Sequence, residues 1–263
     1  VQDSHAGFND MDFRTAVAQS SNVYFAKAMW DRYGVTGKKQ QYSDYLHEEL
    51  HLGQTVGLEM LGERKPSITT DWKVPDPGVM LVKMAYGYRV RLAPIQMITF
   101  YNAIANGGKL VRPRLVKAIM RDGEVVQEFP VQVVKEQIAK PQTIEWIQRI
   151  LREVVSEGLG KKAGSDKFEV AGKTGTAQMS KGALGYKAGG TKYLLSFAGY
   201  FPADNPRYSC IVCIQKEGLP ASGGGMSGVV FHNIAEGIMS QILKVSMEDA
   251  RDSSSVLLPR AKG

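Results

Sequence analysis

The chain has 263 residues, of which 43% are hydrophobic and 22% charged, a balance typical of a globular protein long enough to build a substantial core. Its formal net charge is +7, but the basic residues are scattered, and no lysine or arginine run is long enough to form a nucleic-acid-binding stripe. No stretch approaches the roughly 18 consecutive apolar residues of a membrane span. A nucleic acid is therefore not expected as a partner, and no membrane span is expected within these residues.

Hydrophobic periodicity and turn residues place helices mainly in the first part of the chain and strands in the second. The helical patterns cover residues 12–19, 23–33, 38–51, 94–106, 143–157 and 229–244. The strand patterns cover residues 110–119, 125–129, 168–178, 192–201 and 207–216. The stretch 54–90 is rich in glycine and proline and shows no long periodicity. Grouped helices followed by consecutive antiparallel strands predict one α+β domain over 1–245, with a loose polar tail over 246–263.

One motif suggests a metal site. His47-Glu48-Glu49-Leu50-His51 matches the H-E-x-x-H pattern, which on a helix places two imidazoles on one face as zinc ligands, with the first glutamate as general base. The helix is expected to end at Gly53, and the other two histidines lie near the chain ends, so a third histidine ligand has no natural candidate. Glu59 and Glu63 could serve instead, but they lie in a turn-rich segment. A zinc peptidase that uses His47 and His51 stays a remote alternative, and no metal site is predicted.

Two further segments carry side chains suited to acyl chemistry. Ser20-Ser21-Asn22 lies where one predicted helix ends and the next begins, although serine and asparagine are also the common helix-capping residues. Lys173-Thr174-Gly175-Thr176-Ala177-Gln178 lies in a predicted strand, where glycine often marks the close approach of a ligand or of another backbone. An ammonium, two hydroxyls and exposed backbone amides are the donors needed to bind a carboxylate and a developing oxyanion.

Together these segments resemble the S-x-N and K-T-G motifs of the serine penicillin-binding proteins and β-lactamases. Between them, Ala85-Tyr86-Gly87-Tyr88 and then Ala93-Pro94-Ile95-Gln96 resemble the G-Y-G…T-P-x-Q segment of class B penicillin-binding proteins, with alanine where threonine is usual. Residues 103–116 resemble their A-x-x-A-N-x-G…P-x-x-V stretch. The resemblance covers about residues 5–244, and its details are closer to the cell-division (septal) branch than to the elongation branch.

The resemblance implies the penicillin-binding protein/β-lactamase-like transpeptidase fold, an antiparallel sheet flanked by helices. It implies a serine D,D-transpeptidase that cross-links peptidoglycan stem peptides, is acylated by β-lactam antibiotics and needs no cofactor. Ser20 would relay a proton and Asn22 would bind the substrate's amide carbonyl. The backbone N–H of Thr176 would form half of the oxyanion hole. The substrate-binding residues implied by the resemblance are Lys173, Thr174, Gly175 and Thr176, of which Lys173 would also supply positive potential for catalysis.

The family's nucleophile motif, S-x-x-K, has no match here, because no serine is followed three residues later by lysine. Since only 19 residues precede Ser20, we expect a fragment that begins after the nucleophile helix, incomplete at the N-terminus and inactive by itself. The resemblance places the full-length enzyme on the extracytoplasmic (periplasmic) face of the cytoplasmic membrane, anchored by an upstream transmembrane helix and in contact with other cell-division proteins. The alternatives are a D,D-carboxypeptidase or β-lactamase of the same fold, and a catalytically dead β-lactam sensor or scaffold.

Overall fold

A three-stranded antiparallel sheet forms the centre of the computed structural model, which describes residues 3, 10–179 and 191–255. Its strands are β7 (Ala171–Met179), β8 (Lys192–Phe201) and β9 (Tyr208–Glu217), hydrogen-bonded in that order. The sequence predicts all three strands within three residues of their observed ends. The register pairs Lys173 with Ala198, so the K-T-G segment is fully integrated in the sheet.

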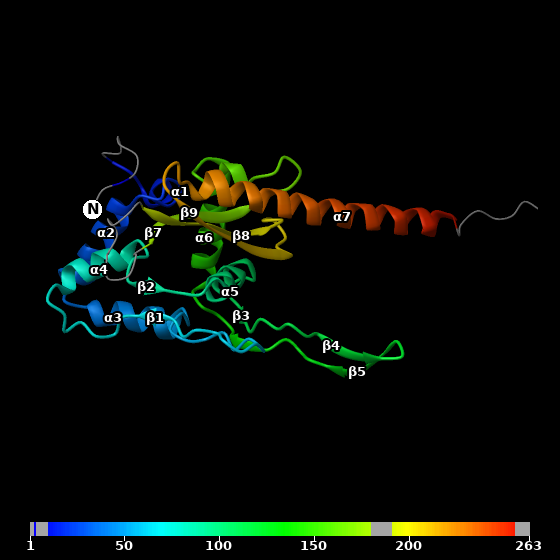
Figure 1. The fold of residues 1–263 in the computed structure, drawn as a ribbon, viewed down its shortest axis with the longest axis horizontal. Helices are drawn as coiled ribbons and strands as arrows, with labels where there is room; N and C mark the ends of the chain where they lie inside the picture. Colours follow the sequence, from blue (N-terminus) through cyan, green and yellow to red (C-terminus); the bar gives the residue numbers. More distant parts are fainter. Residues whose placement is uncertain (1–2, 4–9, 180–190, 256–263) are drawn as a thin grey trace, which may run out of the picture.

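Helices cover both faces of this sheet (Figure 1). Helix α7 (Gly228–Ser255) packs on one face, and α5 (Pro94–Ala105) and α6 (Pro141–Ser156) pack on the other. Both α5 and α6 begin with proline at the first helical position, where its missing N–H costs nothing. The α+β class and the antiparallel sheet flanked by helices are therefore confirmed.

Alternating side chains of β8 divide the core into two layers. Phe197 and Phe201 point toward α7, and their rings lie 4.7 and 5.6 Å from the ring of Phe231. The neighbouring Tyr200 points the other way and packs with buried residues of α5 and α6. All four aromatic side chains are fully buried. Because strand side chains alternate between faces, one strand thus anchors helices on both sides of the sheet.

Helix α6 connects the sheet to the first helix of the chain, α1 (Phe13–Ala18). Its apolar stripe is buried, as the sequence pattern predicts. On the side facing α1, Trp146 stacks on Phe13 with ring centroids 5.6 Å apart. Glu153 accepts two hydrogen bonds from the guanidinium of Arg14. These contacts fix the position of the Ser20-Ser21-Asn22 segment that follows α1.

The remaining helices form a layer beside the sheet. Helix α2 (Asn22–Met29) continues into the π-helical turn η1 (Trp30–Gly34), and α3 (Lys39–Asp44) continues into a second such turn, η2 (Tyr45–Glu49). Helix α4 (Pro77–Ala85) contacts α2 and lies within the stretch for which the sequence shows no long periodicity. A third hydrophobic cluster, formed by Leu46, Ile68 and Met84, holds this layer together.

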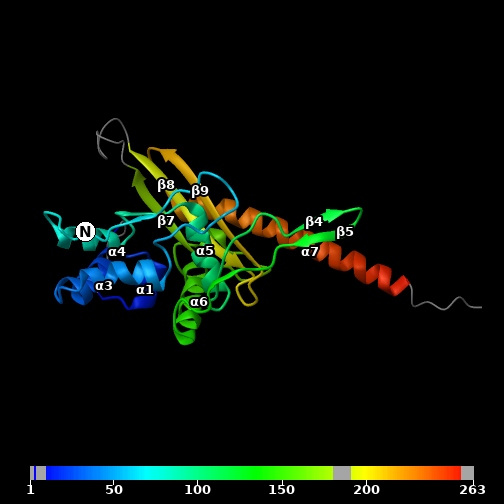
Figure 2. The same cartoon turned by 90° about the horizontal axis from the view of Figure 1, so that it is seen from below.

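Three two-stranded sheets complete the fold. Strand β1 (Ser67–Ile68) pairs with β2 (Val90–Arg91), and β3 (Leu110–Val111) pairs with β6 (Val133–Lys135). The expected continuous strand over 110–119 is wrong, because β3 ends at Val111 and the chain resumes in a separate hairpin. That hairpin projects from the body at the end where α7 also extends (Figures 1 and 2), and consists of strands β4 (Ala118–Arg121) and β5 (Glu124–Glu128).

Helix α7 is longer than the sequence predicts. Instead of ending at 244 it continues to Ser255, so the first ten residues of the expected loose tail over 246–263 are helical. The sequence pattern misses this extension because the apolar repeat ends while helix-compatible residues such as Met247 and Glu248 continue. Residues 256–263 lie outside the described part of the chain.

The two core layers predict where substitutions destabilise the protein. Phe231→Ala removes a fully buried ring that contacts Phe197 and Phe201, so we expect the free energy of unfolding to fall by about 3–5 kcal/mol. The matched control is Ile119→Ala on the projecting hairpin, where the side chain is 47% exposed and the expected loss is under about 1 kcal/mol. Denaturant unfolding of both variants measures the difference, and equal losses would contradict this view of the core.

Candidate active site

The Ser20-Ser21-Asn22 segment forms the break between α1 and α2. Ser21 is the N-cap of α2: its hydroxyl accepts a hydrogen bond from the N–H of Tyr24 at 3.1 Å and donates one to the carboxylate of Asp3 at 2.7 Å. Asp3 also accepts from the N–H of Val23 at 3.0 Å. Ser21 is 3% exposed. The capping role that this motif also suggests therefore belongs to its middle residue.

Capping by Ser21 leaves Ser20 and Asn22 available for other roles. In the described part of the chain, neither of their side chains makes a hydrogen bond. Ser20 has a φ of 55°, in the left-handed region that residues other than glycine seldom adopt. Such backbone conformations cluster at functional sites, where the surrounding structure holds them in place. Among the described residues, the two side chains expected to be catalytic thus have polar groups that are not engaged in capping.

The Lys173-Thr174-Gly175 segment lies on β7, which is an edge strand of the sheet. Gly175 faces Ser196 of β8 so closely that a Cβ at this position would lie 2.5 Å from the serine Oγ. Gly172 is equally constrained, because a Cβ there would lie 2.7 Å from the carbonyl oxygen of Ala198. The close approach of β8 therefore leaves no room for a side chain at these two positions.

The ammonium of Lys173 is shielded from water by the fold. Burial lowers the pKa of its ammonium from an ordinary 10.5 to about 8. Its Nζ donates to the carbonyl oxygen of Thr174 at 3.3 Å, and among the described residues no carboxylate pairs with it. Within that part of the chain its ammonium makes no direct hydrogen bond to Ser20 or Asn22. A partly desolvated cation without a counter-ion favours the binding of an anion.

The backbone of β7 offers donors along its open edge. The N–H of Gln178 points away from β8, because it donates to the hydroxyl of Tyr88 at 3.2 Å. N–H groups alternate in direction along a strand, so those of Thr176 and Thr174 point to the same open side. In the described part of the chain, no further strand pairs with this edge. By this register the N–H of Thr176 is directed outward, away from β8.

The two threonine side chains lie on the face of the sheet that is covered by the glycine-rich turn η5 (Gly223–Ser227). The Oγ1 of Thr176 accepts a hydrogen bond from the N–H of Gly223 at 3.0 Å. The methyl group of Thr174 lies 3.3 Å from the position a Cβ would take at Gly224. Lys173 points to the opposite face by strand alternation, so the ammonium and the threonine hydroxyls flank the edge from two sides.

The turn that follows α6, at Gly158 and Leu159, lies between the two motif segments. The N–H of Leu159 donates to the carbonyl oxygen of Ala18 at 3.1 Å, two residues before Ser20. A Cβ on Gly158 would lie 2.4 Å from that same oxygen. On the other side, a Cβ on Gly224 would lie 2.2 Å from the carbonyl oxygen of Leu159. The structure thus places S-S-N and K-T-G on either side of a shared turn.

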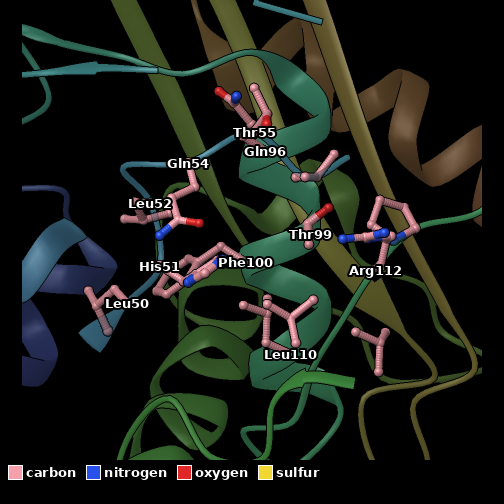
Figure 3. A pocket seen from close by; sticks show the side chains of 14 residues that line it. Leu50, His51, Leu52, Gln54, Thr55, Gln96, Thr99, Phe100, Leu110 and Arg112 are labelled. Atoms are coloured by element: carbon pink, nitrogen blue, oxygen red, sulfur yellow. The ribbon is translucent and has the colours of Figure 1, made fainter. Parts of the chain in front are cut away.

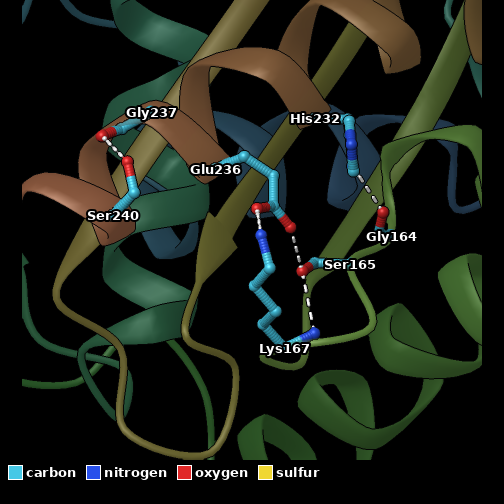
Figure 4. A network of polar contacts seen from close by, with 7 residues as sticks. All are labelled: Gly164, Ser165, Lys167, His232, Glu236, Gly237 and Ser240. Carbon is cyan, nitrogen blue, oxygen red and sulfur yellow. Dashed lines mark hydrogen bonds and ion pairs between the residues drawn. The ribbon is translucent and has the colours of Figure 1, made fainter. Parts of the chain in front are cut away.

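Helix α7 holds the segment that leads into β7 (Figure 4). Glu236 accepts hydrogen bonds from the hydroxyl of Ser165 and the ammonium of Lys167, which hold the pKa of its carboxyl below the usual value. One turn earlier, Nδ1 of His232 donates to the carbonyl oxygen of Gly164 at 2.7 Å. The long helix therefore fixes the start of the strand that carries Lys173.

The H-E-x-x-H segment crosses the end of a helix. His47 lies in η2 with its Nε2 3.3 Å from the carbonyl oxygen of Ile68, and its ring packs against Gly53. His51 follows the helix with a φ of 56°. Within residues 3, 10–179 and 191–255, no group of three His, Cys, Asp or Glu side chains is placed to hold a metal ion. The geometry gives no support to the zinc alternative.

The fold matches those of solved penicillin-binding proteins. The structure of penicillin-binding protein 3 from Mycobacterium tuberculosis, complexed with aztreonam, superimposes with a TM-score of 0.75 at 30% sequence identity. The match covers 92% of this chain and 54% of that one. The apo form of the same protein gives a TM-score of 0.76 at 29% identity.

The chain belongs to the penicillin binding protein transpeptidase domain family, whose model matches residues 1–236. Penicillin-binding protein PbpB of M. tuberculosis is 30% identical over 214 residues, and peptidoglycan D,D-transpeptidase FtsI of Buchnera aphidicola subsp. Schizaphis graminum is 28% identical over 205. These matches cover 77% and 78% of this chain, but only 30% and 33% of the relatives. Such relatives support the septal class B type. None of the helices described here has the length and apolar content to cross a bilayer.

Sequence reasoning misses the residues that join the motifs. Gly158 looks only like a helix stop, and the glycines of η5 look only like a flexible loop. The run Gly223-Gly224-Gly225 directly before a helix is the one sequence signal for this contact, since successive glycines permit two backbones to touch. The role of Tyr88 has no sequence signal of its own, because it depends on the distant strand β7.

The shifted pKa of Lys173 predicts a pH dependence of stability. The unfolded chain releases this proton near pH 10.5, whereas the folded protein releases it near pH 8, so the unfolded state binds more protons between these values. The free energy of unfolding should therefore rise from pH 8 to 10.5 by up to about 3 kcal/mol through this group. Relative to wild type, Lys173→Met should lose that rise, as measured by denaturant unfolding across the range.

The control for this experiment is Lys192→Met, whose ammonium is 48% exposed and paired with Glu217. It should keep the wild-type pH profile. Tyrosines titrate in the same range, but they contribute equally to all three proteins and cancel in the differences. A profile of Lys173→Met that follows wild type would show that Lys173 is not desolvated.

The shared turn makes Gly224 sensitive to a single methyl group. Gly224→Ala places a Cβ against the Leu159 carbonyl oxygen, so η5 must move, and we expect the free energy of unfolding to fall by about 1–3 kcal/mol. Gly237→Ala is the matched control, because its Cβ meets no atom within 4 Å in helix α7 and should gain up to about 1 kcal/mol. Changes of the same sign in both variants would contradict the close contact at Gly224.

Proposed function

We propose that the chain supplies the substrate-binding side of a serine D,D-transpeptidase that cross-links peptidoglycan stem peptides in septal cell-wall synthesis. The observation that carries this proposal is the open edge of β7, with Lys173 beside it and the Thr176 N–H directed outward. An extended peptide adds to such an edge through main-chain hydrogen bonds. The D-Ala-D-Ala end of a stem peptide provides an extended backbone and a carboxylate.

The reaction of the full-length protein is acyl transfer in two steps. A serine hydroxyl of an S-x-x-K segment attacks the carbonyl carbon between the two D-Ala residues, and its proton passes to a neighbouring base. The C–N bond breaks, and the terminal D-Ala leaves as an amine that has gained a proton. An amine of a second stem peptide then attacks the serine ester, forming the cross-link and restoring the serine.

The residues of this chain take the supporting roles. The outward N–H of Thr176 stabilises the tetrahedral oxyanion, and a donor of this kind is typically worth about 3–4 kcal/mol of barrier. Lys173 has a pKa of about 8, so it is mostly protonated at pH 7 and attracts the terminal carboxylate. The hydroxyls of Thr174 and Thr176 would bind that carboxylate. The hydrogen-bond donor Asn22 would hold the substrate amide carbonyl, and Ser20 would pass a proton to the leaving nitrogen.

β-Lactams imitate the D-Ala-D-Ala unit and would acylate the same serine. The relative of known structure from M. tuberculosis is described in complexes with aztreonam and with ampicillin, which supports this class of ligand. The full-length protein would lie on the extracytoplasmic face of the cytoplasmic membrane, with an anchor outside this chain. Contacts with other cell-division proteins would involve the full-length protein.

The proposal predicts which protein reacts with a fluorescent penicillin. The full-length protein should be labelled covalently, and the 263-residue chain alone should not, because none of its serines is followed three residues later by lysine. In the full-length protein, Lys173→Ala should slow acylation at least 100-fold through loss of carboxylate binding and positive potential. Gel fluorescence against time gives the acylation rates.

The matched control is Lys192→Ala on the neighbouring strand, which should acylate at the wild-type rate. Labelling of the 263-residue chain would show that the nucleophile lies within it. A full-length protein that is not labelled at all would overturn the transpeptidase proposal and favour the sensor or scaffold alternative.

A further inference from the structure

A cavity of about 190 Å³ lies between the segment that follows η2, helix α5 and strand β3 (Figure 3). Leu50, Leu52, Phe100 and Leu110 contribute apolar walls. None of its lining residues belongs to the S-S-N or K-T-G segment. The transpeptidase proposal therefore assigns this cavity no role.

Two polar groups of the lining are already engaged in the fold. Gln96 is 3% exposed, and its amide accepts from the N–H of Ala93 at 2.8 Å and donates to the carbonyl oxygen of Arg64 at 3.0 Å. The hydroxyl of Thr99 donates to the carbonyl oxygen of Ile95 at 2.7 Å. Both side chains shape the helix side of the cavity but keep little capacity to select a ligand.

Arg112 is different, because its guanidinium has no partner among the described residues. Its backbone is held by a hydrogen bond from its N–H to the carbonyl oxygen of Gln132 at 2.9 Å, and Figure 3 shows its side chain next to Thr99. Gly57 passes directly over the guanidinium, where a Cβ would lie 3.2 Å from Nε. Arg112 as a whole is exposed, so its guanidinium can be reached on the side that Gly57 does not cover.

The carboxylate of Glu63, next to Gly57, is already hydrogen-bonded within the fold. Glu63 accepts hydrogen bonds from the N–H groups of Val56 at 2.6 Å and Gly57 at 3.0 Å, so both of its oxygens are used to fold the rim. No acidic residue lines the cavity. The lining therefore carries one guanidinium and no counter-ion.

The imidazole of His51 also lines the cavity, and in Figure 3 it lies on the other side from Arg112. Burial, and then the charge of Lys135, lower the pKa of this imidazole. The ammonium of Lys135 is itself held by the carboxylate of Glu49 at 2.9 Å. His51 is thus neutral at pH 7 and can donate or accept one hydrogen bond.

We propose that this cavity binds a small carboxylic acid whose apolar body is about the size of an aromatic ring, with its carboxylate on Arg112. The volume fits such a body, since apolar protein cavities of about 150 Å³ admit benzene. The planar fork of arginine matches a carboxylate through two parallel hydrogen bonds. The inference goes beyond the transpeptidase reaction and does not depend on it.

The test uses benzoate as the probe and benzamide as its neutral analogue, titrated into the 263-residue chain and followed by methyl NMR of Leu110 and Val111. Benzoate should give saturable shifts with a dissociation constant in about the millimolar range. Benzamide should bind about fivefold more weakly, because it offers the guanidinium no charge. Absence of saturable shifts with benzoate, or equal binding of the two probes, would overturn the proposal.

Two variants locate the anion contact. Arg112→Gln should weaken benzoate to the level of benzamide and leave benzamide binding unchanged, which also shows that the cavity stays folded. Arg114→Gln, which neutralises a nearby arginine outside the cavity, should bind both probes like wild type. An equal loss of benzoate binding in both variants would show a general charge effect and refute the site. Arg112→Lys keeps the charge without the fork, and should fall between wild type and Arg112→Gln.

Discussion

Backbone atoms around the turn after α6 approach one another so closely that side chains are excluded, and the candidate site depends on this contact. Gly158 lies against the carbonyl oxygen of Ala18, and Gly224 lies against that of Leu159. Through this turn the helix break at Ser20 and the strand that carries Lys173 are held in one arrangement. Close packing of this kind resists small displacements, because protein interiors deform little before contacts clash.

Near this turn, the S-S-N and K-T-G segments each divide structural and chemical roles among adjacent residues. In the S-S-N segment, Ser21 serves as the helix cap, and the side chains of its two neighbours make no hydrogen bond to any residue that the structure describes. In the K-T-G segment, strand alternation separates Lys173 from Thr174 and Thr176, so that charge and hydroxyls approach a ligand from different sides of the edge. Structural and chemical roles are thus distributed among adjacent residues, and a motif of three letters does not reveal which residue has which role.

Much of the fold follows from the sequence because its signals are local. The strands β7, β8 and β9 and helix α6 have strong periodicity, and all four are found where the pattern predicts them. Helix α4 is missed because it is short, lies in a turn-rich stretch and buries only Leu81 and Met84. The strand expected over 110–119 fails because β3 pairs with β6 only at Leu110 and Val111, and this pairing depends on tertiary contacts.

The candidate site divides in the same way. The residue types of Ser20, Asn22, Lys173 and Thr176 can be read from the sequence by resemblance, but their availability cannot. That Ser20 adopts a left-handed backbone, that burial lowers the pKa of Lys173, and that the Thr176 N–H faces outward are consequences of packing between distant segments. Interactions between residues far apart in the chain leave no periodic trace in it.

The open edge of β7 has a consequence for the protein in the absence of substrate. Unpaired N–H and carbonyl groups along an edge strand accept any extended chain, including the edge of another copy or of a partly unfolded neighbour. Two glycines and a lysine in this strand lower its tendency to pair with itself, yet they are also the residues that a ligand would need. A ligand bound along this edge would therefore block aggregation through it. The protein would be most prone to self-association when no ligand is bound.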